Sequence, residues 1–152
     1  MDAKHAHVTF SVENVRYAIP ASCVVEIVRA AAVTPLRAAP AVVQGIIDYR
    51  GAVLPVFDVA RRFRHQPREV RAAHRMIVAE TGRRRVVLHV DSVESLADID
   101  PGAIDQVATR LPSDVPIAGI ARTPDGLLVI QDLDRFLDDA ESRQLEEALS
   151  SR

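Results

Sequence analysis

The stretch IIDYRGAVLPVFDVARRF, residues 46–63, holds two apolar, strand-like segments with a charged tip between them. Gly51 lies at that tip, and runs rich in Val and Ile bounded by turn residues are typical of strands. Beyond the second segment, Asp58 stands where a carboxylate can accept the free N–H groups of a helix's first turn. The stretch therefore predicts two strands joined by a short loop and followed by a short helix.

The same arrangement recurs near the end of the chain. Each copy runs Gly-Ile, a loop with glycine, an apolar strand and an aspartate that opens a short helix. The spacing differs by one residue, which leaves chance similarity as the alternative. A pseudo-repeat in a β-rich chain favours two related small barrels that share a core. The first copy uses Gly45, Ile46, Gly51 and Asp58, and the second uses Gly119, Ile120, Gly126 and Asp132.

The rest of the chain is also mostly β, with short Val- and Ile-rich runs between turn signals. The run at 24–29 fits either a helical turn or a strand. The final residues, 138–152, are rich in helix formers and predict a short amphipathic helix. Further strands are expected at 8–12 and 17–19, joined at Glu13-Asn14, and at 76–80 and 86–90, joined at Gly82; a proline loop is expected between Pro35 and Pro40, and a long connection at 98–116.

Composition limits the classes of function. The chain has 152 residues, 48% of them apolar, and a formal net charge of −2. It is therefore expected to form about one globular domain without a general attraction to nucleic acid or to an anionic membrane. No apolar run approaches the roughly 20 residues that cross a bilayer, and no signal peptide is recognised, so a cytoplasmic protein is expected. The single cysteine, Cys23, is expected to be a small core residue.

Enzyme signatures are missing from the sequence. There is no glycine-rich phosphate loop, no G-x-S-x-G motif and no zinc spacing of cysteines. Five histidines occur without ligand neighbours at a metal spacing, and each is expected at the surface. No catalytic residue, cofactor or metal site is therefore predicted. The histidines are His5 and His7 in an expected N-terminal tail, and His65, His74 and His89.

A basic run at 83–85 is the one feature that suggests nucleic acid. These arginines, with Arg68, Arg71 and Arg75, would give a small-barrel binder its phosphate contacts. No aromatic stacking partner lies nearby. A solvated hairpin turn that protects a strand edge is therefore the favoured interpretation.

Two charges stand inside apolar runs, Glu26 and Arg50. Buried charges are rare unless they are paired, so a partnership between these two is one interpretation. A solvent-facing turn arginine is the other, and the residues alone do not decide between them.

Three segments together resemble the CheW-like domain family. That family carries a V-x-E-I segment, a proline loop, G-x-I-N-L-R-G, an apolar strand with proline and a D-L-x-x-x-F helix start. A strand ending in V-D-x-V and a closing Gly-Ile, Gly, D-L-x-x-x-L segment follow. The matching segments are VEIVRAAAVTPLRAAPAVVQGIIDYRGAVLPVFDVARRF at 25–63, VVLHVDSVESL at 86–96 and IAGIARTPDGLLVIQDLDRFL at 117–137.

The resemblance implies a mostly β fold of two intertwined five-stranded SH3-like barrels with a groove between them, plus the C-terminal helix. A tail at 1–7 would precede a domain at 8–137. The first barrel would cover roughly 15–70, and the second roughly 71–137 with the N-terminal strand.

The resemblance also implies a function. Stand-alone members of this size are non-catalytic adaptors that bind the regulatory domain of the histidine kinase CheA and the cytoplasmic tip of chemoreceptors. The chain would then be cytoplasmic and recruited to receptor arrays at the membrane, without inserting into it. A non-flagellar pathway, such as surface motility or biofilm signalling, is an alternative, and a nucleic-acid binder is a weaker one.

Site residues follow from the matched motifs. Glu26 and Arg50 would form a salt bridge that fixes the receptor-binding loop, Asp48, Tyr49, Arg50 and Gly51. Asp48 and Tyr49 replace the family's Asn-Leu, which places the carboxylate and phenol where partner choice is expected. The candidate kinase-contact region is Val33, Leu36, Val42 and Val43, for which core positions beneath a loop are the alternative.

Overall fold

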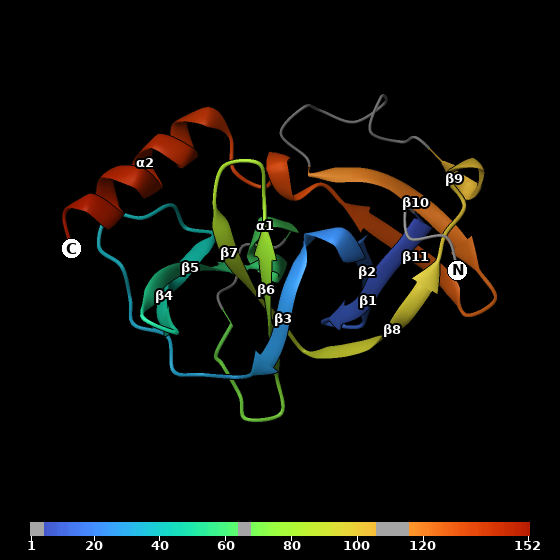
Figure 1. The fold of residues 1–152 in the computed structure, drawn as a ribbon, viewed down its shortest axis with the longest axis horizontal. Helices are drawn as coiled ribbons and strands as arrows, with labels where there is room; N and C mark the ends of the chain where they lie inside the picture. The colour runs from blue at the N-terminus through green and yellow to red at the C-terminus, as the bar shows by residue number, and fades with distance from the viewer. Residues whose placement is uncertain (1–4, 64–67, 106–115) are drawn as a thin grey trace.

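The computed structural model describes residues 5–63, 68–105 and 116–152, and it holds two β-sheets. One sheet has six strands in the order β8-β1-β2-β11-β10-β9, and the other has five in the order β3-β6-β7-β5-β4. Figure 1 shows α2 at the end formed by the five-stranded sheet, and β9 at the opposite end. The mostly β architecture with one C-terminal helix is therefore confirmed.

The six-stranded sheet contains β1 (Ala6–Val12), β2 (Val15–Pro20), β8 (Ser92–Asp98), β9 (Ile104–Asp105), β10 (Ile117–Thr123) and β11 (Gly126–Gln131). The five-stranded sheet contains β3 (Val24–Arg29), β4 (Val43–Tyr49), β5 (Ala52–Asp58), β6 (Arg75–Glu80) and β7 (Arg85–Val90). The helices are α1 (Val59–Phe63) and α2 (Asp139–Ser150), with 3-10 turns η2 (Ala21–Cys23), η3 (Pro101–Ala103) and η5 (Leu133–Arg135).

The chain enters one sheet, builds the other and then returns. β1 and β2 belong to the six-stranded sheet, β3 to β7 form the five-stranded one, and β8 to β11 complete the first. The expected boundary near residue 70 does not separate the sheets, because β6 and β7 pair with β3 and β5. Strand pairing, which a linear reading does not reveal, sets the division.

The first hairpin illustrates how local sequence sets the register. Glu13 and Asn14 both have positive φ, 48° and 68°, as a two-residue type I′ turn requires. β1 and β2 pair on either side of them, with Val12 opposite Val15. His7 lies within β1 and is only 7% exposed, so its expected place in a frayed tail is wrong.

The main core lies between the two sheets. Phe10 and Ile19 from the six-stranded sheet share it with Leu88 from the five-stranded one, and all three are fully buried. The ring of Phe57, at the end of β5, stacks on that of Phe136 after η5, with centroids 4.7 Å apart. Because apolar side chains from both sheets fill one core, the two sheets are expected to unfold together.

Both copies of the sequence repeat occupy equivalent places. The register shifts at Gly45 in β4 and at Gly119 in β10. A Cβ at Gly45 would lie 2.2 Å from the carbonyl oxygen of Thr34, and one at Gly119 would lie 2.3 Å from a methyl carbon of Ile104. Each glycine therefore lets a neighbouring segment approach closely. The aspartates behave alike too, accepting backbone N–H bonds at the start of α1 and of η5.

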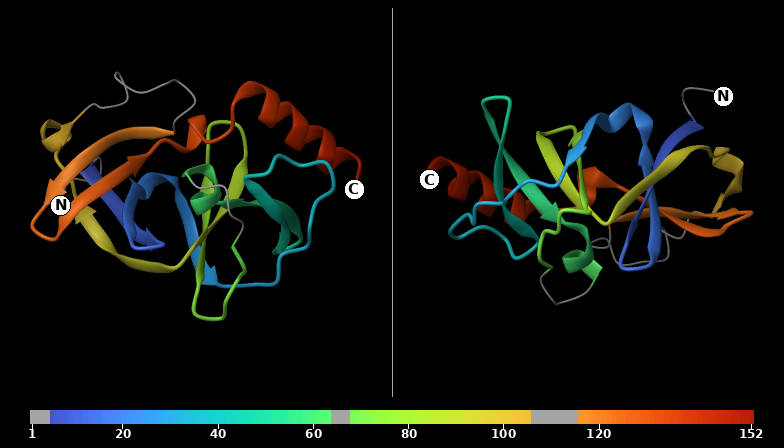
Figure 2. Two further views of the ribbon diagram at one scale, coloured as in Figure 1. Left: turned by 180° about the vertical axis from the view of Figure 1, so that it is seen from behind. Right: turned by 90° about the horizontal axis from the view of Figure 1, so that it is seen from below.

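Figure 2 shows α2 beside the five-stranded half from two sides. Charged contacts and buried side chains dock it there. Asp138 and Glu141 form a capping box at its start. Leu145 and Ala148 are buried against the core. Arginines of the β6–β7 turn form ion pairs with α2: Arg83 pairs with Asp139 at 3.4 Å, and Arg84 pairs with Glu146 at 2.9 Å.

Candidate functional site

The loop between β4 and β5 is a tight turn of two residues. Arg50 and Gly51 have φ values of 52° and 87°, and positive φ at both positions defines a type I′ turn. Asp48 Oδ1 accepts a hydrogen bond from the backbone N–H of Gly51 at 2.8 Å. The carboxylate that replaces the family's asparagine therefore stabilises the turn itself.

Arg50 and Glu26 are in contact. Arg50 Nη2 lies 2.7 Å from Glu26 Oε1, so the contact joins the β4–β5 turn to strand β3. The Arg50 side chain is 73% exposed, whereas that of Glu26 is 35% exposed. The arginine is thus both solvent-facing and paired, which joins the two interpretations that the sequence left open.

Tyr49 completes this group. Its hydroxyl donates a hydrogen bond of 2.5 Å to Glu26 Oε1, the same oxygen that Arg50 approaches. The Arg50 guanidinium carbon lies 5.2 Å from the centroid of the Tyr49 ring, within reach of a cation–π interaction. The hydrogen bond to Glu26 raises the pKa of the Tyr49 hydroxyl. Three side chains from two separate segments therefore hold one another; we call them the Glu26–Tyr49–Arg50 cluster.

Exposed apolar side chains lie on the same strand as Glu26. Strand β3 is largely apolar, yet its Val25 and Ile27 side chains are 39% and 42% exposed. The strand lies at the edge of its sheet. Ile27 is opposite Ile77 of β6, which belongs to the core between the sheets, so Ile27 lies on that same face of the sheet. The alternation of Val24 to Arg29 could have pointed to these two residues, because an edge strand with apolar side chains on both faces suggests a partner.

The opposite sheet offers a similar position. Leu96 on edge strand β8 is 59% exposed and lies opposite Val8, a member of the shared core. Each sheet therefore carries an exposed apolar side chain on an edge strand, on the face turned toward the shared core.

Two of the four expected kinase-contact residues are core, which is the alternative that the sequence left open for them. Val42 and Val43 are 6% and 7% exposed and belong to the core between the sheets, so their assignment to a contact surface is corrected. Leu36 and Val33 are partly buried, each packed against a core cluster. Leu36 and Ala39 of the proline loop pack against the same core that contains Val42 and Val43.

A hollow lies where the two sheets meet. Its lining combines residues from the end of β6 with residues from β11 and from η2, including Cys23. Cys23 is half-buried there rather than fully packed, and burial raises the pKa of its thiol.

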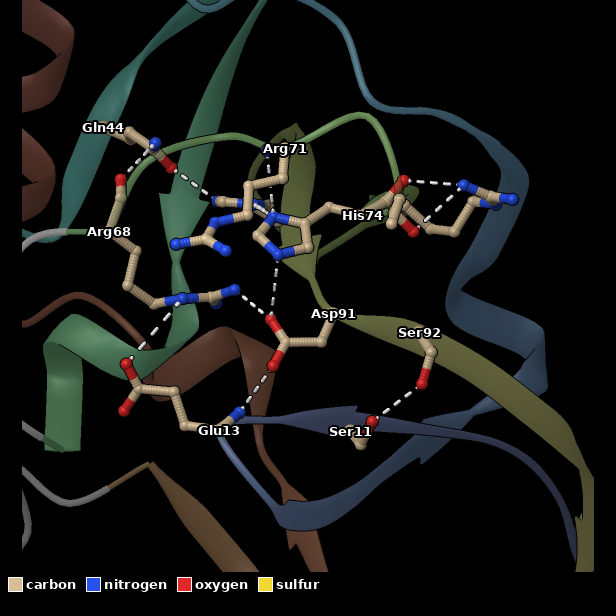
Figure 3. A network of polar contacts seen from close by, with 11 residues as sticks. Ser11, Glu13, Gln44, Arg68, Arg71, His74, Asp91 and Ser92 are labelled. Atoms are coloured by element: carbon tan, nitrogen blue, oxygen red, sulfur yellow. Dashed lines mark hydrogen bonds and ion pairs between the residues drawn. The ribbon is translucent and has the colours of Figure 1, made fainter.

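A second polar group, made of other residues, connects the two sheets (Figure 3). Arg68 forms an ion pair with Asp91 and lies 3.9 Å from Glu13, at the β1–β2 turn. Asp91 also accepts a hydrogen bond from the Glu13 backbone N–H at 2.8 Å. Since Asp91 links β7 to β8, this contact fixes the chain where it crosses from one sheet to the other.

His89 belongs to this group and is fully buried, so its expected surface position is wrong. Its Nδ1 lies 3.0 Å from Gln44 Oε1, and its Nε2 lies 2.7 Å from Nδ1 of His74. Burial lowers the pKa of His89 to about 4, and burial also lowers the pKa of the half-buried His74. His65 lies outside the described residues.

The described ranges contain no group of three or more His, Cys, Asp or Glu side chains able to hold a metal ion. No helix within those ranges is long and apolar enough to span a bilayer. The Glu26–Tyr49–Arg50 cluster offers an ordered, exposed charge on the edge strand β3. The same strand carries the exposed Val25 and Ile27, of which Ile27 lies on the opposite face from Glu26, and exposed charges and apolar side chains on one edge strand suit binding.

Comparison with known proteins gives a consistent result. A family model described as CheW-like domain matches residues 6–141. A probable chemotaxis protein CheW from Rhizobium etli is 31% identical over 112 residues, which make up 72% of this chain and 72% of that protein. Protein FrzA from Myxococcus xanthus is 32% identical over 122 residues, or 80% of this chain and 71% of that protein.

A solved structure shares the fold. The scaffolding protein TtCheW from Thermoanaerobacter tengcongensis superposes with a TM-score of 0.78 at 27% identity. The alignment covers 90% of this chain and 94% of that one.

Proposed function

Because the chain belongs to the CheW-like domain family, a family of scaffolding proteins in chemotaxis-type signalling, we propose that it is a non-catalytic adaptor coupling chemoreceptors to the histidine kinase CheA. The observation that carries the proposal is the Glu26–Tyr49–Arg50 cluster on an edge strand, β3, that also exposes Val25 and Ile27. In this role the protein acts in the cytoplasm, at arrays of membrane receptors.

The chemistry of this surface supports a helical protein partner. Interfaces pair a desolvated apolar centre with polar groups at the rim. Strand β3 supplies the exposed apolar side chains Val25 and Ile27, and the exposed Arg50 supplies a charge paired with Glu26 of the same strand. An amphipathic helix presented by a receptor would cover apolar side chains of this kind.

The kinase contact requires a different surface. Val42 and Val43 are buried, so they offer little exposed surface for that contact. We propose that the regulatory domain of the kinase binds exposed ends of the sheets instead, which leaves β3 available to the receptor.

The receptor-binding role is tested by a pull-down with a receptor-tip fragment and, separately, with the kinase regulatory domain. Arg50→Ala should weaken receptor binding about 5- to 100-fold, because it leaves the partly exposed Glu26 without its ion pair at the contact. Kinase binding should be unchanged, which makes it the internal control. Equal receptor binding by wild type and Arg50→Ala would show that the β4–β5 loop is not part of the receptor-binding surface.

A second pathway is favoured by one comparison. Protein FrzA is not described as a chemotaxis protein, and at 32% identity it is as similar to this chain as the probable chemotaxis protein from Rhizobium etli is at 31%. A coupler in a non-flagellar chemosensory pathway is therefore the second candidate. Nucleic-acid binding is not favoured, since Arg83 and Arg84 pair with acidic side chains of α2.

A further inference from the structure

We propose that Tyr49 is the positioning residue of this surface: its buried ring holds a hydroxyl against Glu26, and the carboxylate so fixed is what orders Arg50. The contact is made by a residue at which the chain departs from the family's Asn-Leu-Arg-Gly pattern. The consequence for receptor binding rests on the proposed function, whereas the positioning itself does not.

Arg50 is not ordered by the ion pair alone. Its side chain is 73% exposed, and exposed pairs typically contribute little because solvent screens them and long side chains lose entropy on pairing. A carboxylate that moved freely would hold the guanidinium loosely. Glu26 must therefore be fixed by a second contact.

Tyr49 provides that contact from the core. Its ring is 9% exposed and packs in the cluster that includes Ile47, Leu54 and Val56. A ring fixed in this way can offer its hydroxyl in only a narrow range of positions. The hydroxyl lies 2.5 Å from Glu26 Oε1, and Arg50 reaches the same oxygen at 2.7 Å.

The neighbouring charges do not offer Glu26 an equivalent anchor. Arg85, which lies near enough to act electrostatically on Tyr49, pairs with Glu80 at 2.5 Å. A leucine or phenylalanine at position 49 would fill the same apolar site without a donor. The order of support therefore runs from the core to the Tyr49 ring, then to the Glu26 carboxylate, and finally to Arg50.

The first test is a spectrophotometric titration of the tyrosines. The chain has two tyrosines and no tryptophan, so the difference between wild type and Tyr49→Phe isolates the ionisation of Tyr49. Its pKa should exceed the ordinary value of about 10 and fall toward that value in Glu26→Gln. Tyr17→Phe is the matched control and should leave this dependence in place. An unshifted pKa, or a shift that persists in Glu26→Gln, would overturn the proposal.

The second test measures affinity for the receptor-tip fragment by calorimetry. Tyr49→Phe should weaken binding about fivefold, the loss expected for one hydrogen bond, while it keeps the ring and its packing. Combining it with Glu26→Gln should weaken binding by less than the product of the two single effects, because the residues act through one contact. Independent, multiplicative effects would contradict the positioning role. If wild type failed to bind the fragment, the proposed function would fall, and the titration alone would decide the role of Tyr49.

Discussion

At the β4–β5 turn, the two side chains that differ from the family's pattern each form a specific hydrogen bond. Asp48 accepts a backbone hydrogen bond from Gly51, and Tyr49 donates one to Glu26. Both functions follow from the direction of each side chain: Asp48 is exposed, whereas Tyr49 is buried. The sequence showed that these two residues were unusual for the family. It did not predict that Tyr49 would bind Glu26, because the two are 23 residues apart.

A substitution at Asp48 separates its charge from its hydrogen bond. In Asp48→Asn the amide oxygen can still accept the Gly51 N–H, so the free energy of unfolding should change by less than about 0.5 kcal/mol. Asp48→Ala removes the acceptor and should cost about 1 kcal/mol. Urea denaturation of the two variants measures the difference. Equal losses in both would mean that charge, and not hydrogen bonding, is what the turn needs.

Element-level packing explains why two glycines stand at matching places in β4 and β10. The sequence identified the repeat, but the reason for its glycines appears only when Thr34 and Ile104 are seen to approach them. The sequence likewise predicted the hairpins, because alternating apolar residues and turn residues are local signals. It did not predict that α2 would use the arginines of the β6–β7 turn, since those pairs join residues 56 to 62 positions apart.

Gly45→Ala tests this close approach. The new methyl group would lie 2.2 Å from a backbone oxygen, which cannot move like a flexible side chain, so the loss should be about 3 kcal/mol or more. Gly102→Ala is a suitable control, because its Cβ would meet its nearest neighbour at an ordinary 3.4 Å. Thermal unfolding compares the two variants. A Gly45→Ala protein as stable as the control would contradict the geometry of β4.

The anchoring of α2 is tested by Leu145→Ala. Leu145 is fully buried, so truncation should lower the free energy of unfolding by about 2 to 5 kcal/mol through lost contacts and a cavity. Leu127 is 58% exposed, and Leu127→Ala should cost less than about 0.5 kcal/mol. Chemical denaturation followed by circular dichroism reports both. Similar small losses would mean that α2 is not docked in solution.

Across the whole molecule, one shared core and one polar group hold the two sheets together. The sequence supported the two-part organisation through its repeat, yet it misplaced the division between the parts. Strand pairing between distant segments decides which sheet a strand joins, and no local pattern records it. His89 was missed for a related reason: a lone histidine is usually exposed, and its burial depends on Gln44 and His74, which other segments supply.

The polar group predicts a pH dependence of stability. The folded pKa of His89 is about 4, below its ordinary value of 6.5, so the unfolded chain binds more protons between these values. The contribution of neutral His89 to the free energy of unfolding is therefore complete above about pH 6.5 and is lost as the pH falls toward 4. It amounts to at most about 3 kcal/mol. His74, Asp91, Arg68, Arg71, Glu13 and Glu69 surround the same region.

Urea denaturation at several pH values measures this effect. Wild type should lose stability between pH 6.5 and 4 more steeply than His89→Gln, in which the titrating ring is replaced by a neutral amide. Parallel pH profiles for the two proteins would show that His89 does not carry the dependence.

The central claim, that the chain joins two partners, is tested most directly by sedimentation of a mixture of the receptor-tip fragment and the kinase regulatory domain. With the protein present, all three components should sediment as one complex, and Arg50→Ala should release the receptor fragment while it retains the kinase domain. If the two fragments associate equally well without the protein, or if it binds only one of them at a time, the coupling account is wrong.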